Sequence, residues 1–347
     1  MSGRRRARAT LPSVGPAILL APLAPLYRAA SRLRAAGYRR GVFASERLPV
    51  PVVSVGNLTF GGTGKTPAVA ALARDLVRRG RRPAVLTRGY GRRSGEPLLL
   101  VGPEPRAGVD EAGDEPLELA GMLPGVPVVV DADRVRGGLR ARAAGADVVI
   151  LDDGFQHLRL ERDLDLVLVD AGDPWGGGWR LREPLSALRR ASAVLVTRLS
   201  PADPEAGLEP IRRRVGRIAP GVPVLGATVR PTAVRTVEGR QDPETLDGVR
   251  VFAFAGIGRP GGFLETLRSL GAEVVEVRWF GDHHRYTAAE FEAILARARR
   301  LEALPVTTGK DAVKLPEDAP VAVLETATVP VEGNWDRLWA VAPEVLR

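Results

Sequence analysis

Short apolar runs alternate with longer amphipathic stretches along most of the chain from Val50 onward. The runs are rich in valine and leucine and apolar on both faces, which is typical of parallel strands covered by helices on both sides. They read VPVVSV (50–55), PAVLT (83–87), VPVVV (126–130), DVVILD (147–152), DLVLVD (165–170) and AVLVT (193–197). This alternation predicts an α/β fold with a doubly wound parallel sheet to about residue 225.

A second, smaller α/β pattern follows. The stretch 222–231 leads into a polar segment, TVEGRQDPETLDG (236–248), which we interpret as a linker. After it the pattern predicts strands at 251–258 and 273–279, and helices at about 261–270 and 287–300. We therefore expect a catalytic domain over residues 46–225 and a smaller C-terminal α/β domain, with its linker, over residues 226–347.

The first 45 residues match neither pattern. A basic start precedes an apolar run, Val14 to Leu26, which is shorter than the ~20 residues of a membrane span and is interrupted by prolines. Leucine, tyrosine and alanine then alternate with arginine at roughly helical spacing. This predicts a basic amphipathic segment over residues 1–45 that lies on a membrane surface. The alternative is an ordinary N-terminal helix packed on the protein.

Composition narrows the possible chemistry. The chain has 347 residues, enough for two domains, and no cysteine, which excludes disulfides, thiolate metal sites and cysteine nucleophiles. Its formal net charge of +9 favours an anionic partner. Only 5% of its residues are aromatic and no nucleic-acid-binding motif is present, so we expect no nucleic-acid partner.

A glycine-rich loop, GNLTFGGTGKTP (56–67), lies between a predicted strand and a predicted helix. Backbone amides in such a turn, at a helix N-terminus, bind phosphate groups. Thr59 stands where the standard phosphate-loop pattern has its first glycine. We expect Lys65 to reach the β- and γ-phosphates and Thr66 to bind Mg²⁺. The predicted nucleotide-binding residues are Leu58, Thr59, Phe60, Gly61, Gly62, Thr63, Gly64, Lys65 and Thr66.

Two adjacent carboxylates, Asp152 and Asp153, end the predicted strand at 147–152. Ligands of α/β sheets bind at the carboxyl ends of the strands, and carboxylate oxygens suit Mg²⁺. An apolar strand ending in two aspartates is a weak signal by itself. Together with the glycine-rich loop it predicts an ATP site with a bound magnesium ion.

Six motifs follow one another along the chain: SVGNLTFGGTGKTP, LTRGYGRRSGE, GDEPLELA, ILDDGFQHLRLERDLDLVLVDA, LREPLSAL and FGDHHRYT. In this order they resemble the motifs of the tetraacyldisaccharide 4'-kinase family, which has the same altered loop. The resemblance implies a phosphate-loop kinase that transfers the ATP γ-phosphate to the 4'-hydroxyl of tetraacyldisaccharide 1-phosphate, giving lipid IVA in lipid A biosynthesis. It also implies an enzyme that acts on an anionic lipid at the cytoplasmic face of the bacterial inner membrane. We expect it to be a monomer.

The same resemblance implies residue roles. Asp114 and His283 match a catalytic dyad, although Asp114 alone reads equally well as a helix cap. Lys65 and Arg182 match catalytic cations, and Thr66, Asp152, Asp153 and Glu183 match the residues around Mg²⁺. Arg88, Tyr90, Arg92, Gln156 and His157 match positions facing the substrate. One departure is Gly309 in TTGKD, where the family usually has glutamate.

Two other functions compete with this one. A membrane-cycling ATPase of the ParA/MinD type also combines a glycine-rich loop with a membrane helix, but it has a lysine where this chain has Phe60. A soluble phosphate-loop kinase acting on a small metabolite would leave the N-terminal segment unexplained.

Overall fold

The computed structural model describes residues 33–93, 96–100, 107–178 and 180–347. Most of the predicted membrane-associating segment, residues 1–32, lies outside them. Residues 33–39 are helical, and Leu33, Val42 and Phe43 are exposed. In the described part of the chain, no helix has the length and apolar character needed to cross a membrane.

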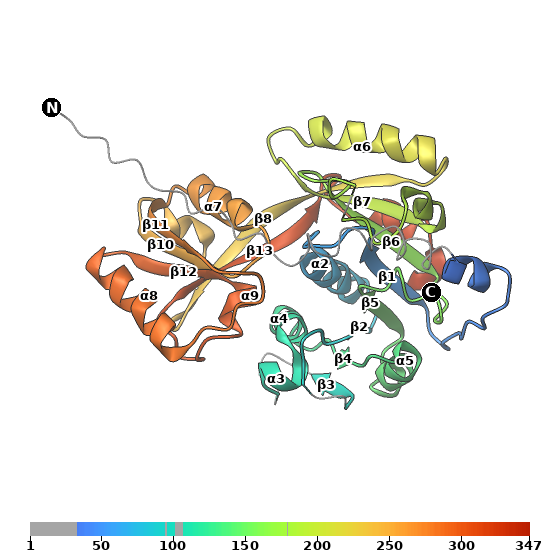
Figure 1. The fold of residues 1–347 in the computed structure, drawn as a ribbon, viewed down its shortest axis with the longest axis horizontal. Coiled ribbons are helices and arrows are strands. Elements are labelled where there is room, and N and C mark those ends of the chain that lie inside the picture. The colour runs from blue at the N-terminus through green and yellow to red at the C-terminus, as the bar shows by residue number, and fades with distance from the viewer. Residues whose placement is uncertain (1–32, 94–95, 101–106, 179) are drawn as a thin grey trace.

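The first lobe is built on the predicted parallel sheet (Figure 1). Its strand order is β8-β7-β6-β1-β5-β2-β4-β3, and every neighbouring pair is parallel except β3 and β4. The strands are β1 (Val52–Asn57), β2 (Pro83–Thr87), β3 (Leu98–Leu100), β4 (Val128–Val130), β5 (Val148–Asp152), β6 (Leu164–Asp170), β7 (Ala193–Leu199) and β8 (Val224–Thr236). Its helices are α2 (Lys65–Arg78), α3 (Val109–Ala112), α4 (Asp114–Met122), α5 (Arg134–Ala143) and α6 (Pro204–Ile218).

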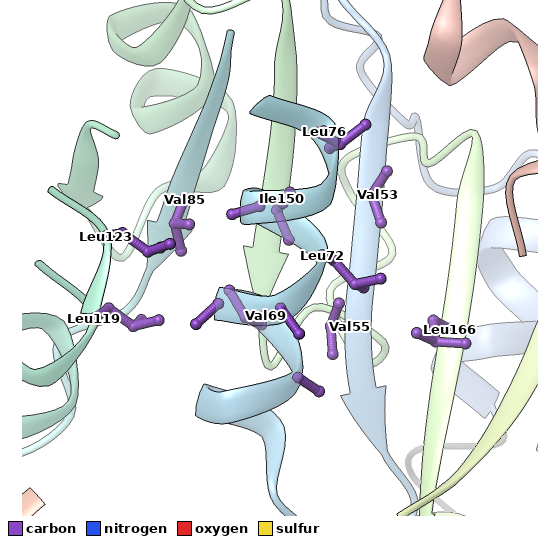
Figure 2. Close-up of a cluster of buried hydrophobic side chains, with 14 of the residues drawn as sticks. Val53, Val55, Val69, Leu72, Leu76, Val85, Leu119, Leu123, Ile150 and Leu166 are labelled. Atoms are coloured by element: carbon purple, nitrogen blue, oxygen red, sulfur yellow. The ribbon is translucent and has the colours of Figure 1, made fainter. Parts of the chain in front are cut away.

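Burial on both faces explains why these strands read as continuous apolar runs. Every residue of β1, β2, β5 and β6 is buried. On one face, α2 lays Val69, Leu72 and Leu76 over the side chains of β1 and β5 (Figure 2). Each fully buried valine or leucine side chain contributes about 1.5–3 kcal/mol, so this contact fixes α2, and with it the glycine-rich loop, on the sheet.

The second lobe is the smaller α/β unit. It contains β10 (Arg250–Ala255), β11 (Glu273–Trp279), β12 (Leu304–Thr308) and β13 (Ala322–Pro330), with α7 (Pro260–Ser269), α8 (Ala288–Arg300) and α9 (Gly309–Ala312). The polar segment at 236–248 is more ordered than the predicted linker. It forms β9 (Gly239–Gln241), which pairs with β8, and a short 3₁₀ helix at Pro243–Leu246.

Two long antiparallel strands, β8 and β13, join the lobes (Figure 1). Their pairing runs from Val323 opposite Arg235 to Pro330 opposite Ala227. Because β8 also pairs with β7, and β13 with β12, both lobes share one hydrogen-bonded sheet. The boundary expected at residue 225 therefore falls inside a strand.

The C-terminal end of the chain departs from the expected unit at 226–347, because it packs on the first lobe. Trp335, Leu338 and Trp339, around α10 (Asp336–Trp339), belong to the same buried cluster as the apolar face of α2. Trp339 Nε1 donates a hydrogen bond to the buried Asp75 carboxylate of α2 at 2.7 Å. The last residues thus stabilise the helix that follows the glycine-rich loop.

Replacing Trp339 by alanine should lower the free energy of unfolding by about 3–5 kcal/mol, because it leaves a cavity in the first-lobe core. Val341→Ala is the matched control, since Val341 lies two residues further along and is 38% exposed; it should cost no more than about 0.5 kcal/mol. Urea denaturation of both variants measures the difference. Equal losses of unfolding free energy in the two variants would show that Trp339 is not part of the first-lobe core.

Candidate active site

The glycine-rich loop connects β1 to α2 and contains all nine predicted nucleotide-binding residues. Gly61 and Gly64 have φ angles of 112° and 79°, conformations that L side chains rarely adopt. Gly64 is the N-cap of α2, and no side chain caps this end of the helix. The first amides of α2 are therefore available to a phosphate group, and the helix dipole favours an anion there.

Thr59, the residue that breaks the standard pattern, lies in a short antiparallel bridge with Leu181. The amide of Phe60 donates to the carbonyl of Arg180 and the amide of Arg182 donates to the carbonyl of Leu58, both at 2.7 Å. This bridge brings the predicted catalytic cation Arg182 against the loop, where its guanidinium lies 5.1 Å from the centre of the Phe60 ring.

Lys65 and Arg182 converge on Asp153. The Lys65 Nζ lies 3.5 Å from Asp153 Oδ1, and Arg182 Nη1 donates to Asp153 Oδ2 at 2.8 Å. Burial opposes ionisation of this carboxyl, but the two cations outweigh it and hold the pKa of Asp153 below its usual value. Asp153 also has a positive φ of 55°, a strained conformation for a residue with a side chain.

Asp152 has the opposite character. It is buried, and its Oδ2 accepts a hydrogen bond from Thr87 at 3.3 Å, while its Oδ1 has no hydrogen-bond partner among the described residues. Burial raises the pKa of Asp152, and the nearby carboxylate of Glu115 raises it further.

The unpartnered Oδ1 of Asp152 fits a hard cation, since Mg²⁺ binds one or two carboxylates and takes its other ligands from phosphates and water. Glu183 does not join this group. It pairs with Arg190 at 3.0 Å and accepts from Gln156 Nε2 at 3.1 Å. Consistently, the described residues contain no cluster of three or more acidic or histidine side chains arranged around a metal.

Asp114 and His283 meet across the two lobes. His283 Nδ1 lies 2.7 Å from Asp114 Oδ2, although the residues are 169 positions apart. The hydrogen bond to Asp114 raises the pKa of His283 above its usual value, although burial and Lys310 oppose it. Burial opposes ionisation of Asp114, but His283, Lys310 and Lys314 outweigh it and hold the pKa of Asp114 below its usual value.

Among the predicted substrate-facing residues, Tyr90 lies beside His283. The exposed Tyr90 ring is 6.1 Å from the His283 ring, and Arg88 is exposed in the same loop. Arg92 donates to the Glu96 carbonyl at 2.6 Å. Gln156 also donates to the Asn57 carbonyl at 2.9 Å, which ties it to the end of β1. Burial lowers the pKa of His157 to about 4, so its imidazole is neutral near pH 7.

Gly309, the departure from the family pattern, begins α9 beside α4. A Cβ at this position would lie 3.7 Å from Glu118 Oε1. Burial raises the pKa of Glu118 to about 8. The position therefore lies next to the helix that carries Asp114.

Sequence reasoning missed an ionic network on the other side of the loop. Asp170, at the end of β6, pairs with Arg198 and with Arg259, which comes from the second lobe at 2.9 Å. Arg259 and Arg180 also pair with Asp173. Together with loop residues 59–63, four of these side chains line a small pocket: Asp170, Asp173, Arg180 and Arg259. The strand-end aspartate in DLVLVD was an available signal, whereas nothing local to Arg259 indicates its partner.

Known proteins resemble this chain over most of its length. The family model of the tetraacyldisaccharide-1-P 4'-kinase matches residues 16–342. A tetraacyldisaccharide 4'-kinase of Anaeromyxobacter sp. (strain Fw109-5) is 45% identical over 317 residues, which cover 87% of this chain and 84% of that protein. One from Syntrophus aciditrophicus (strain SB) is 42% identical over 338 residues, covering 91% and 90%.

A solved structure has the same fold. LpxK from Aquifex aeolicus, solved in an "apo" form in complex with ATP, superimposes with a TM-score of 0.75 at 31% identity. The match covers 96% of this chain and all of that one, which includes both lobes. Since the family model and relatives of over 40% identity each cover most of its length, this chain belongs to the tetraacyldisaccharide 4'-kinase family.

Proposed function

We propose that this protein transfers the γ-phosphate of ATP to the 4'-hydroxyl of tetraacyldisaccharide 1-phosphate, in the pathway that makes lipid A. The observation that carries the proposal is the 2.7 Å contact between Asp114 and His283. Phosphoryl transfer to a sugar requires a group that accepts the hydroxyl proton. A switch ATPase transfers phosphate to water alone, and a small-metabolite kinase would not account for the family to which the chain belongs.

The dyad supplies this base. The Nδ1–H of His283 donates to the Asp114 carboxylate, which fixes the imidazole tautomer and leaves the Nε2 lone pair to accept a proton. As the 4'-oxygen bonds to the γ-phosphorus, its proton passes to Nε2 and the bond to the leaving ADP oxygen breaks. Asp114 then stabilises the imidazolium that forms.

The loop side of the site holds the nucleotide. The amides of residues 61–66 and the Lys65 ammonium bind the β- and γ-phosphates, and Arg182 stabilises the charge on the transferred group. The Asp152 carboxylate and the Thr66 hydroxyl would hold Mg²⁺, which would neutralise charge on these phosphates. Asp153 orients Lys65 and Arg182, because it contacts both.

The acyl chains of the substrate keep it in a bilayer, so we infer that the protein acts at the cytoplasmic face of the inner membrane. The net charge of +9 supports this, because anionic lipids attract a basic surface. The basic residues at 1–45 are the expected contact with that surface. We expect the protein to act as a monomer and to bind no nucleic acid.

Label from γ-labelled ATP should appear in purified tetraacyldisaccharide 1-phosphate in detergent micelles with Mg²⁺, and His283→Ala should lower kcat by roughly 10²–10⁴-fold. His284→Ala is the matched control, because the neighbouring histidine contacts Glu290 at 3.2 Å and not Asp114. The kcat of His284→Ala should stay within about threefold of the wild-type value. ATP hydrolysis without labelled lipid would overturn the proposed reaction.

The acidic limb of kcat/KM reports the pKa of the free base. Asp114 raises the pKa of His283, so activity should fall as the pH drops through a value above the usual ~6.5 of histidine. Asp114→Asn removes the carboxylate, which should move this limb to lower pH and also lower kcat, because the tautomer is no longer fixed. Asp110→Asn, on an exposed neighbour that pairs with Arg285, should leave the limb in place. If the acidic limb of kcat/KM in Asp114→Asn stays at its wild-type pH, Asp114 does not raise the pKa of the general base.

Lys65→Ala should weaken ATP binding and lower kcat together, because the ammonium binds the phosphates in both the ground and transition states. Isothermal titration with a non-hydrolysable ATP analogue and steady-state kinetics measure the two effects. Arg78→Ala, at the opposite end of α2 and exposed, should change neither. Unchanged nucleotide affinity in Lys65→Ala would contradict its place at the phosphates.

A further inference from the structure

Lys310 is a cation with no role in the proposed mechanism, and it lies next to the general base, His283. Its Nζ is 3.3 Å from His283 Nε2 and donates to Asp282 Oδ1 at 2.7 Å. Its side chain is only 17% exposed, so the ammonium is held in a defined position. An ion pair with Asp282 alone would not require the ammonium to contact the imidazole.

The nitrogen that Lys310 contacts is the reactive one. Because Nδ1 of His283 is committed to Asp114, the acceptor proton must go to Nε2. An ammonium has three donors and no acceptor, so in the neutral tautomer whose Nδ1–H donates to Asp114, the contact at 3.3 Å is a hydrogen bond from Lys310 to the Nε2 lone pair. In this state the base already has a partner.

We propose, on the basis of the proposed kinase function, that Lys310 is a positioning residue of the general base: its ammonium occupies Nε2 of His283 until the acceptor hydroxyl replaces it. The hydroxyl that takes this place enters beside a positive charge. That charge favours the oxygen as it loses its proton, and it disfavours protonation of the imidazole before the substrate arrives.

The backbone around His283 supports a fixed position for the imidazole. His283 has a positive φ of 61°, a strained conformation for a residue with a side chain. Asp282, which holds the ammonium of Lys310, is the residue just before it. The strain and the ion pair therefore act on the same short turn and hold Nε2 toward Lys310.

Three charged groups contact the imidazole of His283, and a tyrosine ring lies beside it. Asp114 from α4 lies at Nδ1, Lys310 from α9 lies at Nε2, and Asp282 lies 3.8 Å from Nε2. The Tyr90 ring covers the imidazole at 6.1 Å. Asp114 and Asp282 raise the pKa of His283, while burial and Lys310 lower it. Lys310 is the one cation among these contacts.

Removal of the ammonium should therefore raise the pKa of His283. The chain has only three histidines, so the His283 signal can be followed in ¹³C-histidine NMR spectra and assigned by its loss in His283→Ala. In Lys310→Met we expect the pKa of His283 to rise by about one unit. Lys310→Arg, which keeps the charge, should restore a value close to that of the wild type.

Arg285→Met is the matched control, because it removes an exposed cation two residues from His283 that pairs with Asp110 instead. Solvent screens that charge, so the pKa of His283 should stay close to the wild-type value. If Lys310→Met does not fold, Lys310→Gln removes the same charge and can still donate to Asp282. An unchanged or lower pKa of His283 in the folded variant would overturn the proposal.

The kinetic counterpart separates a positioning role from a structural one. The acidic limb of kcat/KM should move to higher pH in Lys310→Met, opposite to its movement in Asp114→Asn, while the KM for ATP changes by less than about twofold. A uniform loss at every pH would indicate a structural role and overturn the proposal. The NMR titration needs no substrate. It therefore tests the role of Lys310 even if the proposed kinase reaction is wrong, and the two failures give different results.

Discussion

The hydrogen bond between Asp114 and His283 constrains the whole molecule, because it forms only if both lobes are held in a defined relative position. It joins residues 169 positions apart, one at the start of α4 in the first lobe and one in a loop of the second. A hydrogen bond of 2.7 Å tolerates little error in the relative position of the lobes. The long pairing of β8 with β13 sets that position, and the return of the C-terminal residues to α2 fixes the strand pair against the first lobe.

Strained backbone conformations also occur at residues of the candidate active site. Asp153, Arg198 and His283 have positive φ angles, and Glu302 is the fourth such non-glycine residue in the described part of the chain. Each costs about 1–3 kcal/mol and persists only where its surroundings impose it. Arg198 donates to the Gly62 carbonyl of the loop and pairs with Asp170, while Asp153 contacts Lys65. The strain thus places charged side chains at the ends of the strands around the loop.

The predicted strands of the first lobe followed from apolar runs buried on both faces, and they are confirmed at β1, β2 and β4 to β7. The pairing of β8 with β13 could not be predicted from the sequence, because it joins segments about a hundred residues apart and no local sequence pattern indicates it. The same holds for Trp339 on α2. At the site, Asp152 and Asp153 could be predicted because they end an apolar strand. Glu183 was grouped with them only by resemblance, and in the structure it pairs with Arg190 instead.

The proton affinity of His283 is set by both lobes. Asp282 and Lys310 belong to the same lobe as the imidazole and act on it in opposite directions, while Asp114 alone comes from the first lobe. The contribution of Asp114 is a hydrogen bond, which depends on distance and angle far more steeply than the charges do. The imidazole is therefore most basic when the lobes meet as they do here, and any separation that lengthens this bond weakens the base.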